Sequence, residues 1–405
     1  MTRFYDMFRA LKYRNFKLFF PGLAASQAGI WVQTVAISWL VYDLSGSPLV
    51  MGTVMFCNSI PLFLVTPFAG IIVDKFDRHK LLMAVQLLFA LQALIMALIT
   101  AAGAAAVWNI ILLGMLLNTI AAIDAPLRQS SFVCLVDDKA DLGNAISLNS
   151  SCFNLARLVG PAIGGLLIAH TPIWVCFFIN FLCLIPGIIL VGMMRMHNTK
   201  TATARQESFG ESMRAGLAYA WRTPQVRYLL AYMGVFCFRI MVYPTLMPIY
   251  TAESLHTGAD MLGYLLGATG VGSLLASLFT AMLSSAPHLR RVLFGGAVLS
   301  CASLAGLALT TSPAVALGLM FLLGFGSTTF LTPETILIQN VLEDDKRGRV
   351  MALNALFYLA PTAFANLAAG SLTHALTLPC TLLLLAGCML ALALLLSARL
   401  AKLRF

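Results

Sequence analysis

The sequence predicts an all-α membrane protein in which twelve transmembrane helices form two six-helix bundles. The 405-residue chain is 60% apolar and only 10% charged, whereas soluble domains carry roughly 25% charged residues. Twelve apolar segments are long enough to cross a bilayer, which takes about 20 residues. Of the 26 Lys and Arg residues, all but two lie at the termini, in loops on one side, or at the helix ends that border those loops.

This uneven distribution of cationic residues determines the predicted topology. Cationic loops resist translocation, so the Lys- and Arg-rich side is assigned to the cytoplasm. Both termini are then cytoplasmic and the number of spans is even. The two exceptions, Arg157 and Arg239, fall deep inside predicted spans. The net charge of +10 is thereby assigned to loops that face anionic lipid, and nucleic acid is not expected as a partner.

The predicted spans are separated by short external loops. They cover residues 16–42, 49–73, 81–102, 108–131, 143–169, 172–194, 228–250, 261–284, 291–310, 313–337, 350–374 and 378–398. The long hydrophilic segment 195–227 divides them six and six, which predicts an N-terminal bundle over 1–194 and a C-terminal bundle over 228–405. Within this linker, apolar residues recur at helical spacing from Phe209 to Trp221. They predict an amphipathic helix, either a tether between the bundles or a helix on the membrane surface.

The two bundles repeat each other in sequence. In the fifth predicted span Asn149 precedes Gly165 by 16 residues, and in the eleventh Asn354 precedes Gly370 by the same 16. A charged loop comes before each pair. Two repeats related in parallel are typical of transporters whose substrate site lies between the repeats near the midplane.

A turn rich in charged residues follows the second predicted span and contains Gly70, Asp74, Lys75, Asp77 and Arg78. Gly70 is expected to allow a close helix approach, and Asp74 to pair with an arginine or a helix N-terminus in one conformation only, which would make a bistable gate. The alternative is a polar turn that only obeys the positive-inside bias. The segment resembles the signature loop of the major facilitator superfamily, Gly-x-x-x-Asp-Arg/Lys-x-Gly-Arg/Lys-x-Arg/Lys, except that Asp77 replaces a glycine.

The fifth predicted span carries a motif formed by Gly160, Pro161, Gly164 and Gly165. Its glycines allow a neighbouring helix to approach closely, and its proline permits a kink. The motif resembles the Gly-Pro-x-x-Gly-Gly element of antiporter branches of the superfamily, where it is associated with export. Further matches, among them residues 14–16 and 347–350, make the whole chain similar to the macrolide-efflux and enterobactin-exporter branch, whose members export chemically different molecules.

The two intramembrane arginines need a partner or water, because a midplane arginine costs ~2.5–3.5 kcal/mol on insertion scales. The candidate counter-charges are Asp124 and Glu334. Asp124 also lies four residues before Arg128 on one helix face, so these two residues form an alternative pair. Arg157 is expected to serve the substrate or a gate, whereas Arg239 fits a structural pair equally well.

Proton antiport requires a carboxylate whose proton affinity changes as the cavity opens and closes. Asp124 is the first candidate because it is the deepest acid. Glu334, near the inner end of its span, is a candidate for coupling or for a cytoplasmic gate. Gln33, Tyr232 and Tyr243 are candidates for the wall of an amphipathic pocket, since the two tyrosines are eleven residues apart and share a helix face. Lipid packing is the alternative for single aromatic residues.

The expected function is secondary active export of a small amphipathic molecule, siderophore or drug, by alternating access with proton antiport. The partners expected are this substrate, protons and membrane lipid, and the protein is expected to be a monomer. Arg157 and Arg239 against Asp124 favour an anionic or hydrogen-bond-rich substrate over a strictly cationic drug. The alternatives are a lysophospholipid or metabolite transporter of the same fold and, from another class, a non-transporting membrane sensor or assembly factor.

An enzyme, a cofactor or a metal site is not expected. The chain has no buried His and no paired deep carboxylates, and its nine Cys show no CxxC pair. An ATP-driven pump is disfavoured because the phosphate-binding loop G-x-x-x-x-G-K-[ST] does not occur. The branch resemblance and the lack of an organelle-type leader predict a multi-pass protein of the bacterial inner membrane.

Overall fold

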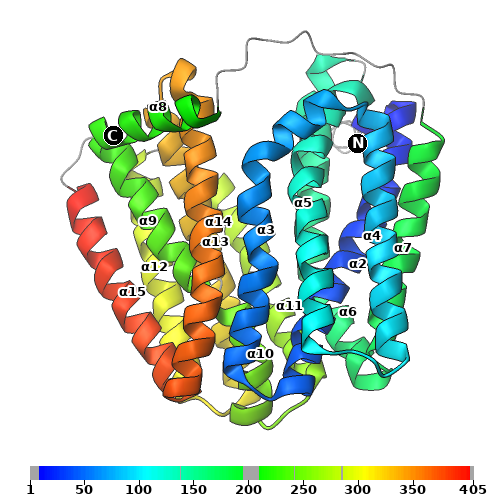
Figure 1. Ribbon diagram of the computed structural model, residues 1–405. Helices are drawn as coiled ribbons and strands as arrows, with labels where there is room; N and C mark the ends of the chain where they lie inside the picture. Colours follow the sequence, from blue (N-terminus) through cyan, green and yellow to red (C-terminus); the bar gives the residue numbers. More distant parts are fainter. Residues whose placement is uncertain (1–8, 137, 195–208, 241, 284–285, 402–405) are drawn as a thin grey trace, which may run out of the picture. The chain divides into compact units, whose positions relative to one another are not determined.

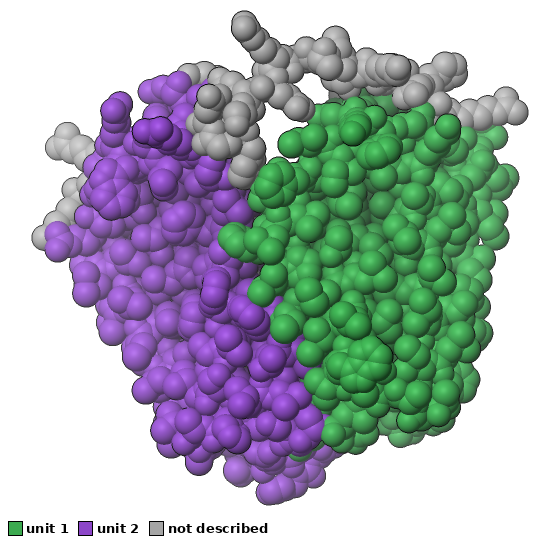
Figure 2. All heavy atoms as spheres, viewed as in Figure 1, with its two compact units in different colours: residues 1–44, 57–204 green, residues 45–56, 205–405 purple. Residues whose placement is uncertain are grey.

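The computed structural model describes residues 9–136, 138–194, 209–240, 242–283 and 286–401, and the elements in these ranges are helices (Figure 1). The described chain forms two compact units, coloured separately in Figure 2. Unit 1 comprises residues 1–44 and 57–204, and unit 2 comprises residues 45–56 and 205–405. The expectation of an all-helical protein is confirmed.

Unit 1 contains six long helices and two short ones at the expected cytoplasmic side. They are η1 (Arg9–Lys12), α2 (Arg14–Ser45), α3 (Pro48–Lys75), α4 (Arg78–Ala101), α5 (Val107–Leu135), η2 (Lys139–Asp141), α6 (Leu142–His170) and α7 (Trp174–Gly192). The first turns of α3 cluster with unit 2, so this helix contributes to both units.

Unit 2 begins with the linker helix and continues with the second set of long helices. They are α8 (Phe209–Arg222), α9 (Pro224–Ile240), α10 (Val242–Ile249), the π-helical turn η3 (Tyr250–Ser254), α11 (Ala259–Ala281), α12 (Ala286–Leu309), α13 (Pro313–Val341), α14 (Asp344–Ala375) and α15 (Leu378–Ala401). The helices α5 and α13 are both 29 residues long and both contain an internal proline, Pro126 and Pro333.

Ten of the described helices are long and apolar enough to cross a membrane. They are α3, α4, α5, α6, α7, α11, α12, α13, α14 and α15. Two predicted spans remain. One coincides with α2, which is long enough but carries Gln27 and Gln33. The other coincides with α9 and α10, and residue 241 between them lies outside the described chain. Large apolar side chains lie on the outer faces, such as Leu98 at 60% exposure, as expected for a surface in contact with lipid.

Glycine-mediated contacts bring helix backbones together in unit 2. A Cβ added at Gly324 of α13 would meet the Thr269 carbonyl oxygen of α11 and would lie 2.9 Å from the Thr269 Cα. A Cβ at Gly52 of α3 would lie 2.8 Å from the Cα of Gly370 on α14. Lipid supplies no hydrophobic driving force between helices, so close packing through small residues stabilises such a bundle.

Unit 1 has the same kind of glycine-mediated contact where α2 crosses α7. A Cβ at Gly22 would lie 2.7 Å from the Cα of Gly187. A cluster of buried apolar residues, which includes Phe16, Phe89 and Phe132, fills the end of the unit near η1. Phe132 contacts Phe19 edge-on at a ring-centroid distance of 6.0 Å. The backbone contact and the aromatic cluster hold α2, α4, α5 and α7 together.

The described part of the linker contains the helix α8. In Figure 1 it lies across the ends of the long helices of unit 2, and it packs on α14 and α9. Gly216 and Ala220 form its buried face, where a Cβ at Gly216 would approach Leu353 Cδ1 at 3.1 Å. Leu217 and Trp221 stay exposed. The helix is therefore attached to its own bundle and presents an apolar edge outward.

The glycine contacts can be tested on one helix by two Gly→Ala substitutions. Gly324→Ala should lower the melting temperature of the purified protein, because overpacking costs about 1–3 kcal/mol. Gly318→Ala on the same helix is the matched control, since an added Cβ there meets nothing within 4 Å. Alanine is the better helix former by about 1 kcal/mol, so the control should be neutral or stabilising. Equal melting temperatures for the two variants would contradict the packing argument.

Candidate functional site

One face of α6 is polar although the helix is apolar overall. Ser147, Ser150, Ser151 and Asn154 are exposed, and they recur at intervals of three and four residues on one helix face, which Arg157 extends by one turn. Each serine hydroxyl donates to a backbone carbonyl four residues earlier, at distances of 2.8 to 3.0 Å. One stripe of α6 therefore offers hydrogen-bonding groups. They are the lone pairs of the serine hydroxyls, the Asn154 amide and the Arg157 guanidinium.

Arg157 is half-buried and lies on α6 one turn beyond Asn154. It makes no ion pair with any residue of the described chain. The expected pairing with Asp124 is not found, because Asp124 pairs with another arginine. The four polar residues that precede Arg157 were not singled out from the sequence as a site, although their helical spacing already placed them on one face.

Asp124 and Arg128 form a buried ion pair one turn apart on α5. The pair joins Asp124 Oδ2 to Arg128 Nη2, and both residues are less than 10% exposed. This is the alternative pairing that the four-residue spacing predicts. Asp124 Oδ1 and Arg128 Nε have no hydrogen-bond partner within the described chain. The ion pair compensates both charges locally.

Glu334 lies on α13 and is 0% exposed. Its Oε2 accepts long hydrogen bonds of 3.4 Å from Asn354 Nδ2 on α14 and from Thr335 Oγ1. Its Oε1 has no partner among the described residues, and neither has Asn354 Oδ1. The two candidate carboxylates are thus in different states, since Asp124 is paired with a cation and Glu334 contacts neutral groups.

Gln33 is completely buried in a chain of amide hydrogen bonds inside unit 1. Asn180 Nδ2 of α7 donates to Gln33 Oε1 at 2.6 Å, and Gln33 Nε2 donates to Gln92 Oε1 of α4 at 3.0 Å. Gln92 in turn donates to the Leu113 carbonyl of α5 at 3.3 Å. These bonds connect α2, α4, α5 and α7, so Gln33 takes part in the packing of its own unit.

Tyr232 on α9 is also fully buried. Its hydroxyl lies 3.2 Å from Ser397 Oγ on α15, and its ring contacts Phe330 edge-on at 4.9 Å. The side chains of Arg239 and Tyr243 lie outside the described residues, so their expected position on a shared face with Tyr232 stays a prediction.

The signature-like turn between α3 and α4 shows what Asp77 does at the position of the family glycine. Asp77 is the N-cap of α4, and its Oδ1 accepts from the Lys80 backbone N–H at 3.0 Å. An N-cap aspartate satisfies one of the free N–H groups at a helix start. His79 Nε2 lies 2.8 Å from the Val191 carbonyl oxygen. Among the described residues, the close helix approach expected at Gly70 is not found, because an added Cβ there meets nothing within 4 Å.

Two glycines of the antiporter-like motif, Gly160 and Gly164, lie against α2. A Cβ at Gly160 would meet the Cβ of Trp31, and a Cβ at Gly164 would lie 3.2 Å from the Val32 carbonyl oxygen. Trp31 also contacts Phe153 of α6 edge-on at 5.9 Å. Pro161 lies inside the helix between the two contacts. The motif therefore allows α6 to pack closely on α2.

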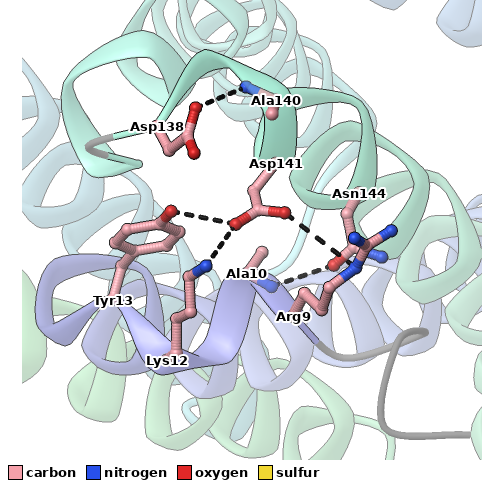
Figure 3. A network of polar contacts seen from close by, with 8 residues as sticks. All are labelled: Arg9, Ala10, Lys12, Tyr13, Asp138, Ala140, Asp141 and Asn144. Atoms are coloured by element: carbon pink, nitrogen blue, oxygen red, sulfur yellow. Dashed lines mark hydrogen bonds and ion pairs between the residues drawn. The ribbon is translucent and has the colours of Figure 1, made fainter. Parts of the chain in front are cut away.

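A polar network joins the N-terminal segment to the start of α6 (Figure 3). Lys12 Nζ lies 2.6 Å from Asp141 Oδ2, and the Tyr13 hydroxyl donates to the same oxygen at 2.9 Å. The Ala10 N–H donates to Asn144 Oδ1 at 3.0 Å. The hydrogen bonds from Lys12 and Tyr13 lower the pKa of Asp141, and the Asp141 carboxylate raises the pKa of Lys12.

This network predicts a pH-dependent contribution of Asp141 to stability. Because the pKa of Asp141 is lowered on folding, its contribution is present above the ordinary carboxyl pKa and is lost as the pH falls through the lowered value. Asp141→Asn should therefore lower the melting temperature at neutral pH, and the difference from wild type should shrink as the solution is acidified. Asp138→Asn is the control, since Asp138 accepts only the nearby Ala140 N–H at 2.9 Å. A difference that persists unchanged at acidic pH would contradict this assignment.

The chain resembles known transporters over nearly its whole length. Residues 7–404 match a protein family described as transmembrane secretion effector. The staphyloferrin A transporter of Staphylococcus aureus (strain NCTC 8325 / PS 47) is 24% identical over 352 residues, which cover 83% of this chain and 84% of that protein. The multidrug efflux pump Tap of Mycolicibacterium fortuitum is 27% identical over 384 residues, which cover 91% of each chain.

The fold is also found in solved structures. The crystal structure of the nucleoside transporter NupG superposes with a TM-score of 0.77 at 13% sequence identity, covering 96% of this chain and 100% of that one. At this identity the similarity establishes the fold alone. The family match, in contrast, covers almost every residue of the chain. The protein therefore belongs to the transmembrane secretion effector family of the major facilitator superfamily and is a multi-pass membrane transporter, not an enzyme.

Proposed function

We propose that the protein exports a small amphipathic molecule across the bacterial inner membrane by alternating access. Relatives named for transport of staphyloferrin A and for multidrug efflux support this class of substrate. The proposal includes twelve spans, in which α2 and the pair α9 and α10 join the ten apolar helices, and cytoplasmic termini, which the distribution of Lys and Arg supports. Residues 1–194 and 228–405 would form the two bundles, joined by the linker 195–227.

The polar face of α6 is the observation that carries this proposal. A row of exposed hydroxyl and amide groups that ends in a guanidinium is unfavourable against hydrocarbon. The same row is favourable along a water-filled path, where it offers acceptors and donors to a solute. We therefore place the substrate-contacting surface of unit 1 on Ser147, Ser150, Ser151, Asn154 and Arg157.

The charge of this surface favours an anionic or hydrogen-bond-rich substrate, such as a siderophore. Arg157 brings a planar guanidinium with five N–H donors, which matches carboxylate groups in a bidentate manner. Asp124 does not offset this charge, because its own charge is compensated by Arg128. Arg239 would add a second cation, and Tyr243 an aromatic group, from the seventh span.

We further propose that inward proton movement drives export. Asp124 and Glu334 are the candidate coupling carboxylates, and the turn with Gly70, Asp74, Lys75, Asp77 and Arg78 is the candidate gate. A lysophospholipid or metabolite transporter of the same fold is the second candidate, since the exposed stripe on α6 would also accept a polar headgroup. A sensor that binds without flux is the alternative from another class.

The export proposal predicts substrate-triggered proton flux in proteoliposomes. Purified protein would be reconstituted with an internal pH dye, and siderophores, lipophilic cations and lysolipids would be added in turn. Flux is expected for the anionic or hydrogen-bond-rich class. Movement of the substrate without protons would retain the transporter and remove the coupling. Binding without any movement would support the sensor.

The role of Arg157 predicts a specific loss in Arg157→Ala. Hydrogen bonds to charged groups contribute about 1.5–3 kcal/mol, which corresponds to an increase in KM for an anionic substrate of about tenfold to a hundredfold. Arg157→Lys should recover part of this loss, because the charge returns without the bidentate geometry. Arg222→Ala on α8 removes an equal charge from an exposed position and serves as the control. High affinity only for lipophilic cations, unchanged in Arg157→Ala, would overturn the assignment.

A further inference from the structure

We propose that Glu334 is the group that carries the transported proton and that Asn354 positions its carboxyl. The inference rests on the proposed function, because it names the coupling site of that exporter. It starts from the juxtaposition of a fully buried carboxyl on α13 with a buried primary amide on α14, joined by the contact from Asn354 Nδ2 to Glu334 Oε2.

A single proton completes the hydrogen bonding of this pair. Two buried oxygens in the pair have no partner in the described chain, Glu334 Oε1 and Asn354 Oδ1. A carboxylate and an amide oxygen are both acceptors, so they cannot satisfy each other. A protonated carboxyl has one O–H donor, which can be given to the amide oxygen while the amide N–H is given to the other carboxyl oxygen. Buried polar groups without partners are costly, so the geometry favours the neutral acid.

No described cation offers the carboxyl another way to stay charged. The residue one turn after Glu334 is Ile338 and the residue one turn before it is Phe330, both fully buried. On α5, in contrast, Arg128 follows Asp124 by one turn and compensates it. The carboxylates on these two 29-residue helices therefore differ in their partners. Asp124 on α5 is compensated by a cation, whereas Glu334 on α13 is neutral only when it is protonated.

The groups on the surrounding helices do not change this conclusion. The helices packed on α13 are α9, α11 and α12, and α14 contributes Asn354. Their charged or titratable residues with described side chains are Arg227, Tyr228, Tyr232, Cys237, Asp260, Tyr264, His288, Arg290, Arg291, Cys301, Lys346, Arg347, Arg349, Tyr358 and His374. None of them forms an ion pair or hydrogen bond with Glu334. The side chain of Arg239 lies outside the described part.

Separation of α13 from α14 would convert this buried acid into an exchanging one. Glu334 lies seven residues before the end of α13 at Val341, about 10 Å along the axis. When α13 and α14 separate, the bond from Asn354 Nδ2 to Glu334 Oε2 breaks and water from the cytoplasm reaches the carboxyl. The O–H bond then breaks, the proton passes to water, and water hydrates the carboxylate. When the site opens outward, the carboxylate takes a proton from water and closes again as the neutral acid.

Infrared difference spectroscopy of the purified, reconstituted protein tests the charge state directly and needs no substrate. At neutral pH the wild type should show a protonated-carboxyl C=O band that is lost in Glu334→Gln. The band should remain in Glu253→Gln, which removes an exposed carboxyl of the same unit. Asn354→Ala should shift the band, because it removes the hydrogen-bond partner. Loss of a carboxylate band in Glu334→Gln would overturn the proposal, and an unshifted band in Asn354→Ala would overturn the role of Asn354.

Transport in proteoliposomes tests the function of the proton. With a substrate found by proton flux, Glu334→Gln should lose export driven by a pH gradient and keep exchange of labelled substrate in the absence of a gradient. Retained gradient-driven export would overturn the proposal. The infrared and transport experiments also distinguish failure of this inference from failure of the proposed export function. If no compound is moved by the wild type, the export proposal fails, while the infrared result still decides the state of Glu334.

Discussion

The bilayer interior supplies no hydrogen-bond partners, and this constraint governs every polar residue in the structure. Backbone groups meet it by forming helices, which is why the described elements are helical. Side chains meet it in different ways. Gln33, Gln92 and Asn180 are joined by hydrogen bonds in a buried amide chain. Asp124 takes Arg128 as its partner. The serines of α6 donate to their own backbone.

Function is assigned to two residues whose charge or hydrogen bonding is left uncompensated by the described chain. Arg157 has no ion-pair partner in the described chain. Glu334 Oε1 has no hydrogen-bond partner there, and neither has Oδ1 of its neighbour Asn354. For these two residues we propose that the missing partner comes from the transport cycle, a solute for Arg157 and a proton for Glu334. The rest of each unit is closely packed, as the glycine contacts show, so these groups are held in defined positions.

Packing explains why the two halves differ in chemistry despite their repeat. Asn149 and Asn354 occupy corresponding positions in the repeat, but only Asn354 is buried, and it contacts a carboxyl. Asp77 shows the same principle on a smaller scale, since an aspartate replaces the family glycine and caps α4. The role of Asp77, which departs from the family pattern, therefore became clear only from its contacts in the structure.

The sequence alone determined the all-helical class, the order of the helices and the family, because these depend on apolar length, periodicity and motifs that are local in the chain. It also identified the four-residue spacing of Asp124 and Arg128, which left two pairings open. Only the tertiary structure decided between these pairings. It also buried Gln33 and Tyr232 in the packing of their units, placed no described residue close to Gly70 and brought Asn354 to Glu334. The contacts of Gln33, Tyr232 and Glu334 join residues from different helices, whose facing sides depend on packing that no local pattern records.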